Sequence, residues 1–287
     1  MYLVKLTNQQ KGSFLALIAV IFITPDALLI RLSNIETWGL LFYRGLIPFT
    51  VVFISLIIIY KSKLYKLFIK IGYAGIFYGL IFAITNITFI ISIENTNVAN
   101  TLVMVALAPM LSALLGTFFL REKPDKKTCL AILITFFSAL YIFYDSLKIG
   151  NIIGDIFGFL TALGLASGAV IIRSVKNRNL VPAAVLGKLT VAIFAIFFVE
   201  TYSLSKNDIF IVPLMCIICV AIPFVLVTLA PRYIPAEEVN LFFLLETILG
   251  PIWVWMVIKE QPSLETIQGG GIIVLTIIIH SYFKLKN

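Results

Sequence analysis

The sequence predicts an all-helical membrane protein with ten transmembrane helices in two inverted five-helix repeats. Three observations lead to this prediction: an apolar composition, long uninterrupted apolar runs and a weak internal repeat. Of the 287 residues, 61% are hydrophobic and 13% are charged, and the mean hydropathy is +1.07. Soluble domains are roughly 45–50% apolar and about 25% charged. The composition therefore excludes a soluble globular enzyme, a disordered protein and a nucleic-acid-binding protein.

Charged and turn residues divide the first half of the chain into five apolar runs. Each run is continuous rather than alternating, which excludes an outer-membrane β-barrel. Each has about 20 residues, the length that a helix needs to cross a hydrocarbon layer of roughly 30 Å. The five predicted helices are Gly12–Leu32, Trp38–Tyr60, Ile71–Ser92, Val98–Phe119 and Lys127–Tyr144.

The second half of the chain shows the same pattern. Its five predicted helices are Gly154–Arg173, Pro182–Tyr202, Ile209–Ala230, Pro235–Ile258 and Leu264–Phe283. The connections are short, so consecutive helices are expected to be antiparallel neighbours. No segment is left over for a soluble domain.

The net charge of +8 is distributed unevenly between the two sides of the predicted membrane. Most Lys and Arg residues fall on the side of both termini, whereas the other side holds only Lys148, Lys206, Lys259 and Arg31. Lys and Arg accumulate in cytoplasmic loops. The charge therefore predicts an inner (plasma) membrane protein with cytoplasmic termini, and it requires no anionic partner.

The ends of the predicted helices repeat. Leu120-Arg121-Glu122-Lys123-Pro124 after the fourth helix matches Ile258-Lys259-Glu260-Gln261-Pro262 after the ninth. Gly12 and Ile30-Arg31 in the first helix match Gly154 and Ile172-Arg173 in the sixth. These matches divide the chain into repeats 1–145 and 146–287. Because five helices is an odd number, the repeats must have opposite orientations, as in many secondary transporters.

The repeat resembles that of the EamA family of the drug/metabolite transporter superfamily. The resemblance is carried by Phe42-Tyr43-Arg44, Arg121-Glu122-Lys123-Pro124, and, in a second copy, Lys259-Glu260-Gln261-Pro262 followed by Gln268-Gly269-Gly270-Gly271. It covers essentially the whole chain. The second half departs from the pattern, because Lys188 takes the place of Arg44. The resemblance implies a central cavity lined by helices one, three, four, six, eight and nine, and export or exchange of small metabolites without ATP.

Two ionisable residues of the first half are expected at the same depth. Asp26 lies six residues from the outer end of the first helix, and Arg44 lies six residues from the outer start of the second. At 1.5 Å per residue both are roughly 9 Å below the outer surface. They can form a fixed pair that joins the two helices, or an outer gate that contacts substrate. Pro25 favours function, because proline breaks a helical hydrogen bond.

Glu246 is the strongest candidate for a substrate or proton site. It lies near the bilayer midplane in the ninth helix, with no basic residue within a helical turn. Desolvation favours the protonated form of such a carboxyl group. The structural alternative is a carboxyl group paired with Lys188 or with a hydroxyl group.

Lys188 mirrors Arg44 from the inner side, and Glu237 and Glu238 begin the ninth helix on that side. These three residues, with Arg44, are predicted to form gates or ion pairs. The uncharged candidates for substrate contact are Tyr78, Asn86, Asn100, Thr101, Ser167, Asn240 and Trp253. Trp253 has an alternative place in an interfacial aromatic belt.

The polar residues within the predicted helices are not expected to form a covalent active site. Cys216 and Cys219 form a C-x-x-C in an apolar run without a second Cys or His pair, so packed thiols are expected and no metal or cofactor. We expect a secondary transporter of amino acids or related zwitterions and amines, an exporter or exchanger, with proton coupling as a further possibility. The expected partners are the lipid bilayer, a small-molecule substrate and protons, with no nucleic acid, in a monomer or homodimer. The alternatives are an uptake carrier for a small organic cation or other metabolite, a channel, and a lipid-handling membrane protein.

Overall fold

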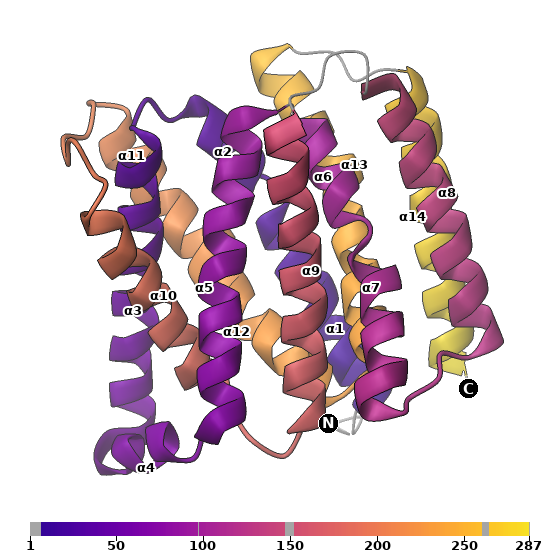
Figure 1. Cartoon of the computed structure of the whole chain (residues 1–287), viewed down its shortest axis with the longest axis horizontal. Coiled ribbons are helices and arrows are strands. Elements are labelled where there is room, and N and C mark those ends of the chain that lie inside the picture. The colour runs from indigo at the N-terminus through magenta and orange to yellow at the C-terminus, as the bar shows by residue number, and fades with distance from the viewer. Residues whose placement is uncertain (1–6, 97, 147–151, 260–263, 287) are drawn as a thin grey trace, which may run out of the picture.

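The computed structural model describes residues 7–96, 98–146, 152–259 and 264–286, and all regular structure in these ranges is helical. The helices run side by side along a common direction (Figure 1). The first described residues and the last lie at the same end of the bundle, which is also the end that carries α4 (Leu64–Ile69).

The first half contains the predicted helices with bounds close to those expected. The first is divided into α1 (Asn8–Ile23) and α2 (Asp26–Leu32). The next two are α3 (Thr37–Tyr60) and α5 (Gly72–Asn95), with the 3₁₀ helix η1 (Lys61–Lys63) and α4 between them. The fourth consists of α6 (Val98–Val105), α7 (Ala108–Leu115) and the π-helical η2 (Gly116–Leu120), and the fifth is α8 (Lys126–Ser146).

In the second half, α9 (Ile152–Ser174) and α10 (Val181–Ile196) come first. The eighth predicted helix consists of α11 (Asp208–Leu214), the π-helical η3 (Met215–Ala221) and α12 (Ile222–Leu229). A 3₁₀ turn, η4 (Ala230–Arg232), leads to α13 (Ala236–Ile258), and α14 (Leu264–Lys286) ends the chain.

Three predicted helices differ from expectation. The first is interrupted at Thr24 and Pro25, where proline has no N–H to continue the helical ladder. The fourth is interrupted two residues before Pro109. The seventh ends at Ile196 rather than Tyr202. There the backbone turns, and the hydroxyl of Thr201 accepts a hydrogen bond from the backbone N–H of Ser203, a contact that competes with helix formation.

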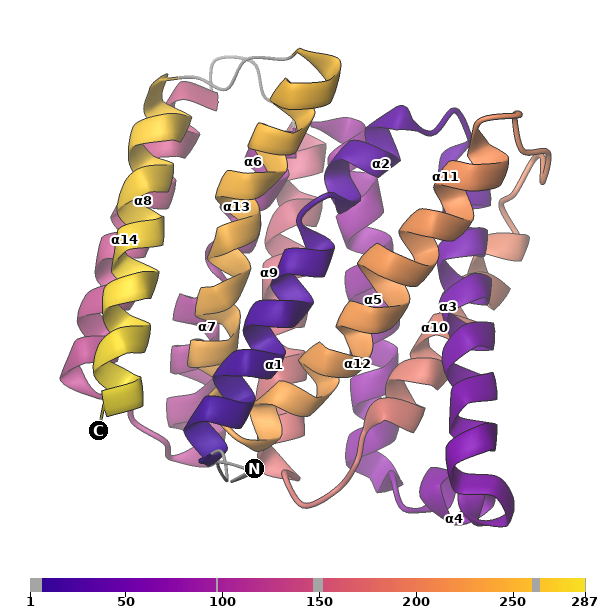
Figure 2. The same cartoon turned by 180° about the vertical axis from the view of Figure 1, so that it is seen from behind.

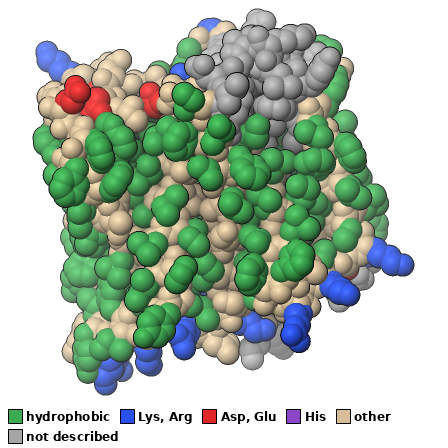
Figure 3. Space-filling model, viewed as in Figure 1, with side chains coloured by type: hydrophobic (Ala, Val, Ile, Leu, Met, Phe, Trp, Pro, Cys, Tyr) green, Lys and Arg blue, Asp and Glu red, His purple; other side chains and the backbone are tan. Residues whose placement is uncertain are grey.

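Within the described ranges, six helical stretches are long and apolar enough to cross a membrane: Asn8–Leu32, Thr37–Ile69, Gly72–Asn95, Ile156–Ser174, Asp208–Arg232 and Ala236–Ile258. Ala108–Leu120, Val181–Ile196 and Ile267–His280 are shorter apolar helices. Hydrophobic side chains cover the middle of the face in Figure 3, and Lys and Arg side chains lie along its lower edge. These features are those of a multi-pass membrane protein.

The largest helix contacts join the two halves of the chain. α5 packs on α9, α3 on α10, α8 on α14, α1 on α12 and α7 on α13. Figures 1 and 2 both show α8 and α14 side by side at one edge, and α3 with α10 at the other. Contacts between consecutive helices of one half, such as α3 with α5, are smaller. The two halves therefore interleave, and each sequence repeat buries its helices mainly against the other.

Glycine allows the close approach of α3 to α10. A Cβ atom on Gly45 would lie 2.5 Å from the backbone nitrogen of Ala192 and 2.7 Å from the carbonyl oxygen of Lys188. Real Cβ contacts are longer, so any larger residue would push α3 away from α10. Gly45 thus sets the position of the helix segment that carries Lys188.

The repeated motifs end their helices in the same backbone conformation. Arg121 (φ 56°) follows η2, and Lys259 (φ 65°) follows α13, and both cap residues are left-handed. Non-glycine residues adopt this conformation in only a few per cent of cases. Its occurrence at both matched positions supports the internal repeat. The following residues, Glu260, Gln261 and Pro262, lie outside the described ranges.

Candidate functional site

A cavity of about 120 Å³ lies between the two halves. A water molecule requires roughly 10–15 Å³ of such space, so the cavity has room for a small organic molecule. Segments α1, α2, α3, α5, α6, α9, α10, η3, α12 and α13 contribute to its walls. The lining residues are Ile23, Asp26, Arg44, Phe82, Thr85, Asn86, Phe89, Val105, Thr161, Leu165, Lys188, Cys219, Val220, Pro223, Phe224, Val227, Phe243 and Glu246.

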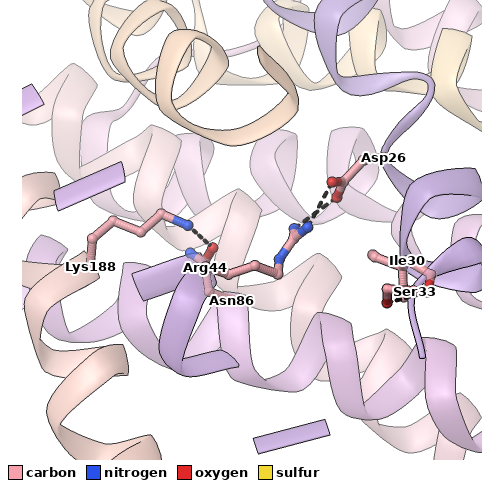
Figure 4. Close-up of polar contacts among 6 residues, drawn as sticks. All are labelled: Asp26, Ile30, Ser33, Arg44, Asn86 and Lys188. Atoms are coloured by element: carbon pink, nitrogen blue, oxygen red, sulfur yellow. Dashed lines mark hydrogen bonds and ion pairs between the residues drawn. The ribbon is translucent and has the colours of Figure 1, made fainter. Parts of the chain in front are cut away.

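Asp26 and Arg44 form a buried ion pair in this wall. The guanidinium group donates from Nη1 to Oδ1 and from Nη2 to Oδ2, both over 2.7 Å. The two groups face each other in Figure 4. The break at Pro25 makes Asp26 the first residue of α2, and α3 brings Arg44 to the same depth. Each charge is therefore satisfied by the other through a two-point contact, the strongest geometry for Arg and a carboxylate.

Lys188 has a different environment. Its ammonium group donates a hydrogen bond to Oδ1 of Asn86 on α5, as Figure 4 shows. Nζ also lies 5.3 Å from the ring centroid of Phe82 and 6.0 Å from that of Phe224. Only 1% of Lys188 is exposed. An amide and two aromatic rings therefore surround this ammonium group, which has three donors and no carboxylate partner among the described residues.

Glu246 is also almost completely buried, with 3% of its surface exposed. Its Oε1 atom has no hydrogen-bond partner among the described residues. Asp26 and Arg44 are the charged groups that act on Glu246 through space, and the same pair acts on Lys188. In the described part of the chain, no ion pair joins Lys188 to Glu246. The cavity thus contains a balanced ion pair and, separately, a cation and a carboxyl group that do not pair with each other.

The model of the EamA-like transporter family matches residues 10–144 and again residues 152–282. The chain belongs to this family.

A solved protein structure has a similar fold. A protein known from its crystal structure matches with a TM-score of 0.73 over 95% of this chain and 96% of its own, at 13% identity. This similarity concerns the fold alone. No curated protein sequence matches the chain significantly.

More helices line the cavity than the EamA resemblance implies. Helices one, three, four, six, eight and nine all contribute lining residues, as expected. The second helix adds Arg44 and the seventh adds Lys188. These two additions supply both cationic groups of the cavity.

Tyr78 and Asn240 line a second, smaller cavity of about 30 Å³. Phe82, Thr85, Leu165 and Val227 belong to the walls of both cavities. The hydroxyl of Tyr78 shares a 2.8 Å hydrogen bond with that of Thr228, and the amide of Asn240 donates to the hydroxyl of Ser112. Both predicted residues therefore already have partners within the protein.

Three of the remaining uncharged candidates, Thr101, Ser167 and Trp253, are not lining residues of the main cavity. Thr101 is buried and shares a 2.8 Å hydrogen bond with Ser92. Ser167 is half-buried and is not a lining residue of either cavity. Trp253 is 37% exposed, and its indole N–H donates to the hydroxyl of Thr24 over 3.0 Å. The side chain of Asn100 lies outside the described part of the structure.

The predicted inner-side carboxylates are separate from the cavity. Glu237 and Glu238 are buried in the first turn of α13, and neither lines the cavity. Glu238 accepts a 2.7 Å hydrogen bond from the side chain of Gln9. Lys188 contacts Asn86 instead, so the structure does not bring the predicted inner gate residues together as one cluster.

Several lining residues escaped the sequence analysis. Phe82 and Phe89 lie four residues before and three after Asn86, which is the spacing of one helix face. That spacing could have identified both. Thr85, Thr161 and Phe224 gave no comparable signal, because nearly every helix of this chain is apolar on all sides.

Proposed function

We propose that the protein is an alternating-access carrier of small metabolites, namely amino acids or related zwitterions and amines, that works as an exporter or exchanger. The observation that carries this proposal is the cavity with Lys188 and Glu246 in its walls, each without an oppositely charged partner among the described residues. Buried charges are normally paired. A ligand with polar groups of its own would supply the missing partners while it occupies the cavity.

We further propose ten membrane-spanning helices in two inverted halves, 1–145 and 146–287. The contact pattern supports this arrangement. A two-fold relation exchanges each helix with the helix at the same position of the other half. The contact of the third helix with the sixth (α5 with α9) then corresponds to the contact of the eighth helix with the first (α12 with α1). The pairs α3–α10, α7–α13 and α8–α14 each correspond to themselves. A pseudo-two-fold relation of this kind is typical of transporters in which the halves rock around a central site.

The proposed location is the plasma membrane, with both termini in the cytoplasm. Lys and Arg line the edge of the molecule that carries α4, and acidic side chains lie at the opposite edge of the same face (Figure 3). Cytoplasmic loops carry such an excess of basic residues. The ion pair between Arg173 and Glu122 lies on this basic side and joins the two halves, with Nε 3.0 Å from each carboxylate oxygen.

Glu246 is the proposed site of proton coupling. When the cavity is empty, a proton satisfies this desolvated carboxyl group, and a bound cationic group replaces the proton. Each turnover would then exchange a proton for the cationic group of the substrate. Export and uptake use the same cycle, and the direction follows from the gradients.

Counterflow in proteoliposomes tests the proposal. Vesicles preloaded with an unlabelled amino acid or amine are expected to accumulate the labelled compound transiently, and Glu246→Gln is expected to abolish this. Met256→Leu, on the exposed side of the same helix, is the matched control. Downhill flux without counterflow would indicate a channel, and flux of none of a broad panel would refute the proposal, as would a chemically altered product or lipid.

A further inference from the structure

We infer that the cavity binds its ligand at two separate ends, with Lys188 and Asn86 holding a carboxylate and Glu246 holding an ammonium group, so that only a zwitterion satisfies the site. This inference rests on the proposed function and narrows its substrate class. It excludes simple amines as substrates, and it assigns one charged group of the ligand to each end of the cavity.

The carboxylate end is built around Lys188. One of the three ammonium donors is used by Asn86, and Phe82 and Phe224 lie beside the charge. Two donors of a buried cation therefore remain for a ligand. The amide N–H₂ of Asn86 donates to the carbonyl oxygen of Phe82 over 2.7 Å, which fixes the amide oxygen toward Lys188. A carboxylate is the ligand group that pairs with an ammonium group in such surroundings.

The ammonium end is Glu246. Glu246 lines the cavity, and its buried Oε1 atom lacks a hydrogen-bond donor among the described residues. An unpaired buried acceptor of this kind destabilises the empty site. A ligand ammonium group would supply both the missing donor and the compensating charge.

Asp26 and Arg44 already satisfy each other. Their two-point contact satisfies both charges, so the pair has little need of a ligand. It acts electrostatically on Lys188 and on Glu246, whereas these two do not pair with each other. A zwitterion that reached both ends would lie beside a neutral pair, and the cavity would then contain no unbalanced charge.

Thermal stabilisation of the purified protein in detergent tests the inference. The probes are 2-, 3- and 4-aminobutanoate, which differ only in the separation of their charged groups, together with butylamine and butanoate. At least one aminobutanoate isomer is expected to raise the unfolding temperature, and the two singly charged compounds are not. Equal stabilisation by butylamine or butanoate, or no stabilisation by any isomer, would overturn the inference.

Two substitutions assign the ends. Lys188→Met and Glu246→Gln preserve shape, and each is expected to weaken binding of the best isomer by about tenfold or more. Thr190→Val, on the lipid-facing side of the helix that carries Lys188, is the control and is expected to bind as the wild type does. Unchanged affinity in a folded Lys188→Met or Glu246→Gln protein would refute the assignment of that end.

Counterflow with the same compounds separates this inference from the proposed function. Flux of butylamine at the rate of the best isomer would agree with the proposed carrier function but would contradict the two-ended site. Absence of flux for a broad panel that includes all five compounds would contradict the carrier itself.

Discussion

Arg44 holds Asp26 through two parallel hydrogen bonds of 2.7 Å, and these bonds join α3 to α2 just beyond the break in the first helix. The contact is buried, and it forms part of the cavity wall. Because each charge is satisfied by the other, the pair fixes the wall without occupying the space that a ligand needs.

Removal of either partner should destabilise the protein. Asp26→Asn or Arg44→Gln leaves a buried charge without compensation, which typically costs about 3–5 kcal/mol. The double variant should recover part of this loss. Arg44→Lys should recover little, since an ammonium group cannot reproduce the two-point contact. Denaturant unfolding in detergent measures each value, and wild-type stability of the single variants would contradict this reading.

The close approach of α3 to α10 at Gly45 should tolerate no added methyl group. Gly45→Ala places a Cβ atom 2.5 Å from the nitrogen of Ala192, and such overpacking costs about 1–3 kcal/mol. Because α10 carries Lys188, displacement of this helix should also reduce counterflow. Gly271→Ala is the control, because no atom lies within 4 Å of its added Cβ. Equal behaviour of the two variants would show that α3 and α10 can separate freely.

Cys219 should report on access to the cavity. It lines the cavity, whereas Cys216 is fully buried and is not a lining residue. A small cationic methanethiosulfonate should block counterflow in Cys129→Ser and in Cys129→Ser/Cys216→Ala, but not in Cys129→Ser/Cys219→Ala. Mass spectrometry of the labelled protein identifies the modified thiol. Preferential labelling of Cys216 would place the cavity wall elsewhere.

The ion pair between Glu122 and Arg173 should control opening on the basic side. The pair is partly exposed, so Glu122→Gln should cost no more than about 1 kcal/mol of stability. It joins the end of the fourth helix to α9 of the other half, and its loss should speed modification of Cys219 by an impermeant reagent added on that side. The charge-swapped variant Glu122→Arg/Arg173→Glu should restore the slow rate. An unchanged rate in Glu122→Gln would show that the pair does not restrain opening.

Much of the architecture could be predicted from sequence because the bilayer imposes it. A spanning helix must satisfy its own backbone and present apolar side chains, so the bounds of α3, α5 and α13 lie close to those predicted. The equal depth of Asp26 and Arg44 followed from counting residues along two helices. Depth alone could not give their two-point contact, which depends on the rotation of each helix.

Counting residues along the helices did not predict the contacts of Lys188. Sequence depth related it to Arg44 and to the inner carboxylates, whereas tertiary packing brings it to Asn86 on α5. That contact exists because the two halves interleave, and helices that are apolar on all sides do not reveal which helix packs on which. The early end of α10 and the break before Pro109 are likewise local features of the backbone that hydropathy does not describe.

The sequence by itself therefore determined the membrane class, the internal repeat and the small set of charged residues within apolar helices, since burial in lipid makes each of these visible in composition. Only the tertiary structure decided how those charges combine. It pairs Asp26 with Arg44, surrounds Lys188 with an amide and two aromatic rings, and leaves one oxygen of Glu246 without a partner in the described cavity. The reason is that helix rotation and the packing of one half on the other determine which side chains meet at a given depth.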